Sequence, residues 1–303
     1  MKIIKIIFIF LTLSSKSVCN DNFKDWLNEF SKYAINEGVS KTTVNRVLKN
    51  AKFLPNVIKY DRYQPEFYED TKTYVDKRAN KKRTLQGVKL YNQHKLFIDK
   101  IEKEFLVEKE LLLSLMAIET NYGKYVGKMD IISSLATLSF DKRRSKFFTN
   151  ELITALRLID MKLIDEKYLF GSWAGAFGYF QFMPSTINNY AIDYDKDNKI
   201  ELKSIKDSFA SAANYINKIG WKKNEPCFRE VILKNNVPSN LLNTSAQKIK
   251  YKKKLKYFKK YIKNYENINI NENYKTAIIT PDKDIIENAN RLEPAFLVFN
   301  NYE

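Results

Sequence analysis

The chain has 303 residues, of which 44% are hydrophobic and 14% aromatic, so it can bury a sizeable core and is not disordered as a whole. With one histidine and two cysteines, a disulfide framework and a zinc ribbon are excluded, and any histidine-based site must use His94. The net charge of +17 permits nucleic acid, an anionic membrane or an anionic cell wall as partner, but Lys, Asn and Ile are frequent everywhere, so charge alone decides nothing.

The first residues, MKIIKIIFIFLTLSSKSVCN, combine a short positive start, an apolar stretch and small polar residues. This layout is typical of a secretory signal peptide, which we place at residues 1–19. Lipid attachment at Cys19 is a weaker alternative, because Val18 is bulky where such sites favour a small residue. An uncleaved membrane anchor stays open. We therefore expect export to the periplasm or cell envelope, with possible membrane attachment through the N-terminus.

The pattern from residue 21 to about residue 109 is helical, and only eight glycines and seven prolines interrupt the whole chain. One apolar face is predicted for the first helix, formed by Phe23, Trp26, Leu27 and Phe30. Ser40 is expected to cap the next helix. A break follows at Pro65, after which residues 90–105 read as one amphipathic helix with His94 as an ordinary surface residue.

Residues 108–123 are apolar on nearly every side and predict a buried central helix that Gly123 caps. Another helix is expected over 146–163. From about Pro226 the character changes, and short strands are expected within 227–234, 276–280 and 296–302. The predicted fold is mainly α, with a small β-containing C-terminal lobe.

Glu119 stands near the end of the apolar helix, directly after Leu115, Met116, Ala117 and Ile118. Apolar neighbours desolvate a carboxyl group and raise its pKa, which suits a general acid near neutral pH. On spacing alone, a solvated or paired glutamate at a helix end explains Glu119 equally well or better.

Glycines cluster between Gly123 and Gly178, which hold five of the eight, and aromatic side chains interleave with them in residues 171–182. Small residues permit close backbone approach to a ligand, and flat aromatic faces suit sugar rings or nucleobases. Gln181 adds both a donor and an acceptor. Tight packing of helices through small residues is the alternative.

The acidic segment 193–207 resembles the first half of an EF-hand loop. Asp193, Asp195 and Asp197 occupy positions 1, 3 and 5, and the Lys199 carbonyl falls at position 7. Ser204 stands at position 12 instead of glutamate, so a standard EF-hand fails, although Asp207 can close a longer loop. Calcium binding and an acidic surface turn are equally compatible with this pattern.

Nine lysines lie within residues 248–263, where Tyr251, Leu255, Phe258 and Ile262 are spaced as on one helix face. This pattern predicts a basic amphipathic helix. Such a helix can contact nucleic acid, anionic lipid or cell-wall polymer, or it can be a solvated helix in a lysine-rich chain.

Four motifs together resemble the membrane-bound lytic murein transglycosylase B family. They are DRYQPEF (61–67), the segment 111–152 around MAIETNYG, the segment 171–202 around GSWAGAFGYFQFMPS, and SAANYINKIGW (211–221). The resemblance implies a lysozyme-like helical core, which we place in a domain over residues 20–221. The residues themselves predict a basic, partly stranded lobe over 222–303. It also implies cleavage, without water, of the β-1,4 bond between N-acetylmuramic acid and N-acetylglucosamine in peptidoglycan.

Glu119 falls on the family's single catalytic acid/base, which would protonate the leaving oxygen and then deprotonate the muramoyl C6 hydroxyl to form a 1,6-anhydro ring. The match also implies that certain residues line the glycan groove or contact its substrate: Ser172, Gln181, Phe182, Met183, Arg144 and Tyr302. It implies a structural Ca²⁺ held by Asp193, Asp195, Asp197, Lys199 and Asp207. No catalytic cofactor and no nucleic-acid partner are expected.

The C-terminus departs from the family pattern. Tyr302 matches a tyrosine that orients the acid, but Glu303 stands at the family's asparagine and the closing helix is absent. A peptidoglycan-binding or scaffold protein without turnover is therefore the second hypothesis.

Overall fold

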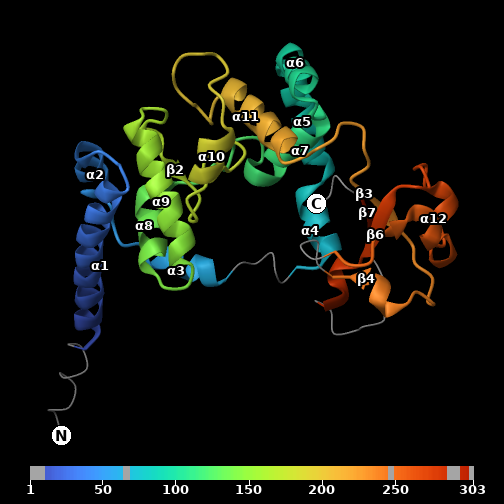
Figure 1. Ribbon diagram of the computed structural model, residues 1–303, viewed down its shortest axis with the longest axis horizontal. Helices are drawn as coiled ribbons and strands as arrows, with labels where there is room; N and C mark the ends of the chain where they lie inside the picture. Colours follow the sequence, from blue (N-terminus) through green and yellow to red (C-terminus); the bar gives the residue numbers. More distant parts are fainter. Residues whose placement is uncertain (1–10, 64–68, 245–248, 285–293, 300–303) are drawn as a thin grey trace, which may run out of the picture.

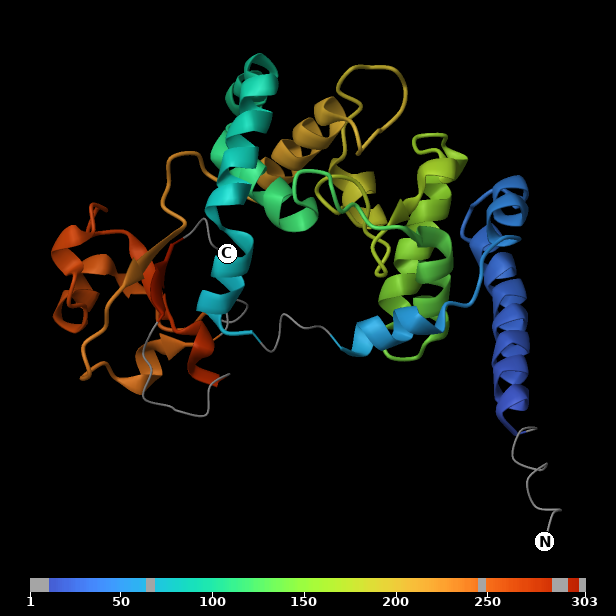
Figure 2. The ribbon, with the colours of Figure 1, turned by 180° about the vertical axis from the view of Figure 1, so that it is seen from behind.

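The computed structural model describes residues 11–63, 69–244, 249–284 and 294–299. The elements of these ranges form an arch (Figures 1 and 2). The first helices stand on one side, a group of helices spans the top, and the C-terminal strands stand on the other side. Tyr302 lies outside the described residues.

Helices dominate up to residue 218. In chain order they are α1 (Leu11–Asn36), α2 (Lys41–Leu48), α3 (Pro55–Arg62), α4 (Thr71–Arg78), α5 (Lys81–Gln93), α6 (Lys95–Phe105), α7 (Lys109–Thr120), α8 (Ile131–Phe140), α9 (Ser145–Asp160), η2 (Glu166–Tyr168), α10 (Pro184–Tyr190) and α11 (Ile205–Lys218). A short antiparallel pair joins β1 (Met129–Asp130) to β2 (Phe170–Gly171). None of the described helices is both long enough and apolar enough to cross a bilayer.

The C-terminal lobe contains a small mixed sheet in the order β3–β7–β6–β4, and β5 also pairs with β6. Its elements are β3 (Phe228–Val231), η3 (Ser239–Leu241), β4 (Leu242–Asn243), β5 (Lys253–Lys254), α12 (Leu255–Phe258), η5 (Lys259–Tyr261), η6 (Tyr265–Asn267), β6 (Lys275–Ile279), η7 (Pro281–Asp284) and β7 (Ala295–Val298). β4 runs parallel to β6, and the other pairs are antiparallel. The three predicted strand regions are confirmed in the described residues.

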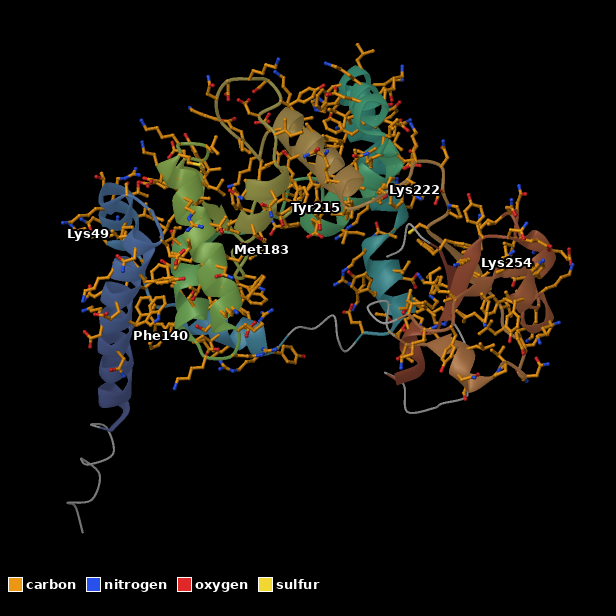
Figure 3. All side chains as sticks on the ribbon, viewed as in Figure 1. Lys49, Phe140, Met183, Tyr215, Lys222 and Lys254 are labelled. Atoms are coloured by element: carbon orange, nitrogen blue, oxygen red, sulfur yellow. The ribbon has the colours of Figure 1, made fainter. Side chains whose placement is uncertain are left out.

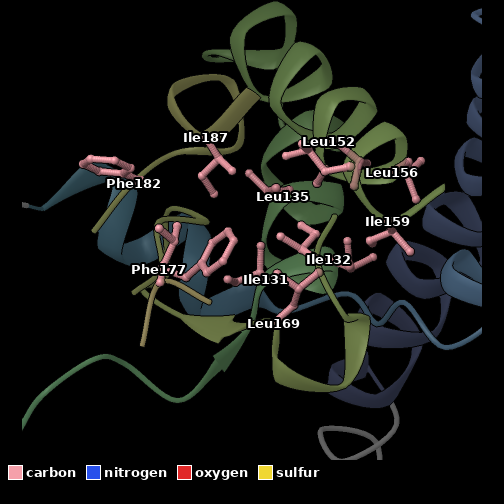
Figure 4. Packing of buried hydrophobic residues seen from close by; sticks show 14 of the residues in the cluster. Ile131, Ile132, Leu135, Leu152, Leu156, Ile159, Leu169, Phe177, Phe182 and Ile187 are labelled. Atoms are coloured by element: carbon pink, nitrogen blue, oxygen red, sulfur yellow. The ribbon is translucent and has the colours of Figure 1, made fainter. Parts of the chain in front are cut away.

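The main core lies between α8 and α9 and continues into the loop before α10 (Figure 4). Leu135 of α8 and Leu152 and Leu156 of α9 are fully buried there. Phe177 and Phe182 form an antiparallel bridge and add their rings to the same cluster. This packing gives the loop that carries residues 177–182 a rigid base.

The predicted face of α1 is confirmed. Phe23 and Phe30 are buried, while Trp26 and Leu27 pack against the same core. The Ser40 side chain caps α2 by accepting a hydrogen bond from the Thr43 N–H at 3.2 Å.

The expectation of one helix over 90–105 is wrong, because His94 leaves helical geometry at φ −122° and ψ 23°. Its N–H still bonds the Leu90 and Tyr91 carbonyls and ends α5, and α6 then starts in a new direction. Tyr91 donates a hydrogen bond to Asp99 at 2.9 Å across this break.

Two details of the apolar helix differ from expectation. Asn121, with φ 49°, is the left-handed cap residue of α7, so the cap lies two residues before Gly123. Asparagine accepts this conformation almost as well as glycine does. Ile118 is 48% exposed, so α7 is buried on one side and not all round.

The lysine-rich segment is not one amphipathic helix. It passes from β5 through one short turn of α12 into η5. Leu255, Phe258 and Ile262 are buried as expected, but Tyr251 is 53% exposed. The chain changes from strand to helix here because these apolar side chains pack into the core of the C-terminal lobe. They do not form one continuous face of a single helix.

The lobe is tied to the helical part by hydrogen bonds. Thr71, at the start of α4, donates its N–H to the buried Asp282 at 3.0 Å. Asn224 of the lobe donates its backbone N–H to Glu108 at 2.7 Å. The domain limits at residues 19 and 221 stay predictions.

Candidate active site

Glu119 lies in the last turn of α7, at a cavity of about 190 Å³. Residues of α7, the loop before α10, α10 and α11 line this cavity: Leu115, Glu119, Phe180, Gln181, Phe182, Met183, Thr186, Ala212, Tyr215 and Ile216. Figure 3 labels Met183 and Tyr215 on the inner side of the arch. Glu119 is the one carboxylate among these lining residues.

Burial against the protein raises the pKa of Glu119 above the usual range of a glutamate. The residue as a whole is nevertheless exposed to solvent. Within the described residues, no ion pair and no side-chain hydrogen bond holds the Glu119 carboxyl, so the paired helix-end interpretation loses its support. A carboxyl group that is desolvated, unpaired and accessible can donate and take back a proton.

Thr120 joins the end of α7 to the loop before α10 by hydrogen bonds. It is 1% exposed, and its hydroxyl donates to the Tyr179 carbonyl at 2.8 Å. The same oxygen accepts the Gly123 N–H at 3.0 Å. The position of Glu119 is therefore coupled to the loop that carries Gln181.

Thr120→Val keeps the shape of this side chain and removes both hydrogen bonds. The Gly123 N–H and the Tyr179 carbonyl, both half-buried, lose their partner, so we expect the free energy of unfolding in urea to fall by about 1–3 kcal/mol. Thr154→Val is the matched control, because the Thr154 hydroxyl only bonds the Asn150 carbonyl one turn back on α9. Equal, small losses in both variants would show that Thr120 does not hold the loop.

The loop before α10 brings three predicted residues together with Glu119. Gln181 adopts φ 49° and donates its Nε2–H to the Gly178 carbonyl at 2.9 Å and the Val126 carbonyl at 3.3 Å. Phe182 is 7% exposed, and Met183 is the residue before the first turn of α10. Their contact with a substrate stays a prediction.

Ser172 and Arg144 do not line this cavity. Ser172 closes a turn, in which its Oγ accepts the Ala176 N–H at 3.0 Å. Arg144 is paired with the buried Asp61, which also accepts a hydrogen bond from Arg143 at 3.0 Å. The predicted substrate contacts of Ser172 and Arg144 therefore have no geometric support from this cavity and stay predictions.

The clustered glycines face protein and not the cavity. A Cβ on Gly175 would lie 2.4 Å from Leu135, and one on Gly178 would lie 2.5 Å from Leu202. Gly123 would meet the Tyr179 ring at 2.6 Å. These glycines serve close packing of the loops that carry the site, so the packing alternative explains them.

Tyr215 is one of the cavity residues that the sequence patterns do not predict. Its ring packs edge to face against Phe182 at 5.7 Å and against Tyr190 at 5.0 Å. Ala212, Tyr215 and Ile216 follow helical spacing on α11, and this periodicity marks the face that reaches the cavity.

The acidic loop brings Asp193, Asp195 and Asp197 together, with one carboxylate oxygen of each within 4.8 Å of the others. Asn198 takes the left-handed conformation at φ 68°, as expected for the residue that replaces glycine. Three carboxylates so close repel one another, and hard oxygen donors of this kind suit a cation such as Ca²⁺. The donor set therefore fits the ion.

Asp207 is not part of this carboxylate cluster, so its predicted role as a ligand of the ion stays a prediction, and in the structure it closes the loop through the backbone. It is buried and accepts the Tyr194 N–H at 2.9 Å and the Glu201 N–H at 2.8 Å. Burial, with a smaller contribution from Asp195 and Asp193, raises the pKa of Asp207. Lys206 lies 3.3 Å from Asp195 and offsets part of the negative charge.

Comparisons with known proteins place the chain among transglycosylases. The transglycosylase SLT domain family matches residues 22–303. Membrane-bound lytic murein transglycosylase B of Escherichia coli K12 is 38% identical over 140 residues, which cover 46% of this chain and 39% of that protein. The chain thus matches well under half the length of this curated relative.

Solved structures agree over most of the chain. SltB3 from Pseudomonas aeruginosa, in complex with NAG-NAM-pentapeptide, is similar with a TM-score of 0.81 at 28% identity, covering 92% of this chain and 73% of that one. Escherichia coli Slt35, in complex with calcium, has a TM-score of 0.72 at 24% identity over 91% of this chain and 84% of that one, and supports the fold alone. The mainly α, lysozyme-like fold class is confirmed. Because the family match extends from residue 22 to residue 303, the chain belongs to the transglycosylase SLT domain family.

Proposed function

We propose that the protein is a lytic transglycosylase of peptidoglycan, with Glu119 as its sole acid/base. The observation that carries the proposal is a single unpaired carboxyl with a raised pKa in an aromatic-lined cavity. Two structures of SltB3, with NAG-NAM-pentapeptide and with NAG-anhNAM-pentapeptide, support the substrate class and the 1,6-anhydro product. The substrate is the β-1,4 bond between N-acetylmuramic acid and N-acetylglucosamine.

The reaction uses one carboxyl group twice, first to give a proton and then to take another. Protonated Glu119 gives its proton to the glycosidic oxygen, the bond from C1 of the muramoyl ring to that oxygen breaks, and the N-acetylglucosamine end leaves as an alcohol. The Glu119 carboxylate then takes the proton of the muramoyl C6 hydroxyl, whose oxygen bonds to C1. Water is not consumed, and Glu119 ends protonated.

This scheme explains why one carboxylate suffices. Glycosidases that use water or an enzyme nucleophile generally place a second carboxylate within about 5–10 Å of the first. Here the substrate's own C6 hydroxyl is the nucleophile, and its N-acetyl group can stabilise the cationic centre. The rings of Phe180, Phe182 and Tyr215 make the cavity apolar around Glu119, which favours the neutral acid before the proton is transferred.

Mass spectrometry of the material released from purified sacculi tests the activity. We expect muropeptides with 1,6-anhydromuramoyl ends, each lighter by one water than the hydrolysis product. Reducing muramoyl ends would identify a hydrolase instead. Protein that sediments with sacculi and releases nothing soluble would support the non-catalytic binding or scaffold hypothesis.

We also propose that residues 193–207 bind a structural Ca²⁺. Asp193, Asp195 and Asp197 would hold it together with the Lys199 carbonyl, while Asp207 keeps the two ends of the loop together. Bound Ca²⁺ would supply the positive charge that lets the three carboxylates lie side by side. No step of the proposed reaction involves the ion.

Calcium should therefore raise the unfolding temperature. At a free concentration of about 100 times Kd, a single site adds about 2.7 kcal/mol to the free energy of unfolding, and EDTA removes it. Asp195→Asn should weaken this response, whereas Asp25→Asn, on the exposed surface of α1, should leave it intact. An unfolding temperature that is the same in calcium and in EDTA would mean that the loop is an acidic turn only.

Residues 1–19 are proposed to direct the chain to the periplasm or cell envelope, where peptidoglycan is found. The layout of the segment supports this, as does a curated relative described as membrane-bound. The N-terminal mass of the protein recovered from the envelope fraction checks the proposal. An unprocessed chain in the cytoplasm would contradict it.

A further inference from the structure

The lysine-rich segment forms an exposed surface that the proposed reaction does not use. We call it the basic patch and define it by Lys250, Lys252, Lys253, Lys254, Lys256, Lys259, Lys260, Lys263 and Lys275, all exposed. Figures 1 and 2 show α12 at the outer end of the C-terminal lobe, on the side away from α7. None of the patch lysines lines the cavity at Glu119.

The fold brings the positive charges of the basic patch close together although they repel one another. β5 and β6 pair so that Lys254 lies directly opposite Lys275. Like charges opposite each other on neighbouring strands repel and destabilise the pair. Lys259 has an ion pair with Glu266 at 3.2 Å, but Lys254, Lys256 and Lys260 make none within the described residues. An anionic partner would relieve this repulsion.

Two tyrosines stand among these lysines at the surface. Tyr251 is 53% exposed and Tyr257 is 39% exposed. The Lys260 Nζ lies 5.0 Å from the centroid of the Tyr257 ring. Tyrosine next to lysine is the combination that favours the boundary between water and lipid headgroups, because each side chain has an apolar body and a polar end.

We propose that the basic patch binds the surface of an anionic phospholipid bilayer. Residues 248–263 contain nine lysines and no arginine. Lysine is a hydrated point charge, whereas planar, bidentate recognition of carboxylates and nucleic acid favours arginine. A set of point charges thus suits the diffuse negative potential of a membrane better than a defined glycan or nucleic-acid ligand. Bound in this way, the lobe leaves the Glu119 cavity free.

Flotation of the full chain with vesicles tests this proposal. One vesicle is neutral phosphatidylcholine, and the other contains about one third phosphatidylglycerol. The triple variant Lys254→Glu, Lys256→Glu, Lys260→Glu reverses three unpaired charges and turns the Lys254–Lys275 contact into an attractive pair, so the lobe should fold. The matched control is Lys49→Glu, Lys82→Glu, Lys89→Glu, which makes the same charge change on exposed lysines of the helical part.

We expect the wild type and the control to bind anionic vesicles at low salt, and the patch variant to partition about 100-fold less. Binding should fall steeply at about 1 M salt, where screening is strong. Neutral vesicles measure what the apolar N-terminus contributes. Equal losses in both variants, or no preference for anionic vesicles, would overturn the proposal, as would duplex DNA that displaces the protein from the vesicles. Muropeptide release from sacculi is measured in parallel and should be the same in all three proteins, so the two proposals can fail separately.

Discussion

Glu119→Gln should lower the rate of 1,6-anhydromuropeptide release by about 10²–10⁴-fold, the usual contribution of a general acid/base. Glutamine fills the same space but can neither donate a proton to the glycosidic oxygen nor accept one from the C6 hydroxyl. The measurement is the initial rate of release from purified sacculi, followed by mass spectrometry. Glu110→Gln, on the exposed first turn of the same helix, is the control and should keep the wild-type rate. A Glu119→Gln variant that remains active would assign the proton transfer to another group.

The raised pKa of Glu119 fixes the pH dependence. The carboxyl is protonated below its raised pKa, so cleavage should decline as pH rises through that value. The free energy of unfolding should also decline as pH rises, because the folded state binds this proton more tightly than the unfolded state does. That stabilisation is present at low pH and is lost as pH rises through the pKa of the folded state.

The stability of the Glu119→Gln variant relative to the wild type should therefore be greater at pH 7 than at pH 4. The midpoint of urea unfolding of the variant minus that of the wild type should be larger at pH 7. Midpoints of urea unfolding at the two pH values for both proteins check the sign. The opposite trend would mean that a cationic partner stabilises the ionised carboxylate, and the proposed acid would then be ionised before the substrate binds.

Much of the fold follows from local patterns in the sequence. The aromatic face of α1, the Ser40 cap and the strands around residues 228–231 and 275–279 are periodic or chemical features of short segments. The break at His94 is not such a feature, because no proline or glycine marks it. There, the packing of α6 against other helices overrides the amphipathic pattern of the segment. The lysine-rich segment departs from its predicted helix for the same reason, since the sheet beneath it imposes its shape.

In the site, too, some features follow from local sequence patterns and others depend on tertiary packing. The desolvation of Glu119 was foreseeable from the apolar residues before it, and the pKa is raised as expected. Periodicity could not tell that Tyr215, almost a hundred residues further along the chain, reaches the same cavity, because the contact depends on the packing of α11. The clustered glycines were ambiguous, since close approach to a ligand and close approach to another loop need the same residue.

Gly127→Ala is the sharpest test of that ambiguity. Gly127 has φ 84°, and a Cβ there would lie 2.0 Å from the Gly171 carbonyl oxygen and 2.7 Å from the Ser172 nitrogen. Both are backbone atoms of the segment that pairs β1 with β2, so neither can rotate away. We expect the free energy of unfolding in urea to fall by about 4 kcal/mol or more. Single substitutions cause losses of this size only when they create severe steric overlap or a serious burial defect.

Gly38→Ala separates the steric overlap from backbone strain. Gly38 has φ 92°, but a Cβ there would meet nothing within 4 Å. Its cost is the strain of a left-handed alanine alone, about 1–2 kcal/mol. The difference between the two variants measures the contact between the chain after α7 and the turn at Ser172. A difference near zero would mean that these backbones can separate freely. A large difference would mean that Gly127 is needed for the close backbone contact between the chain that follows α7 and the turn at Ser172, so that close packing between loops and not approach to a ligand explains this glycine.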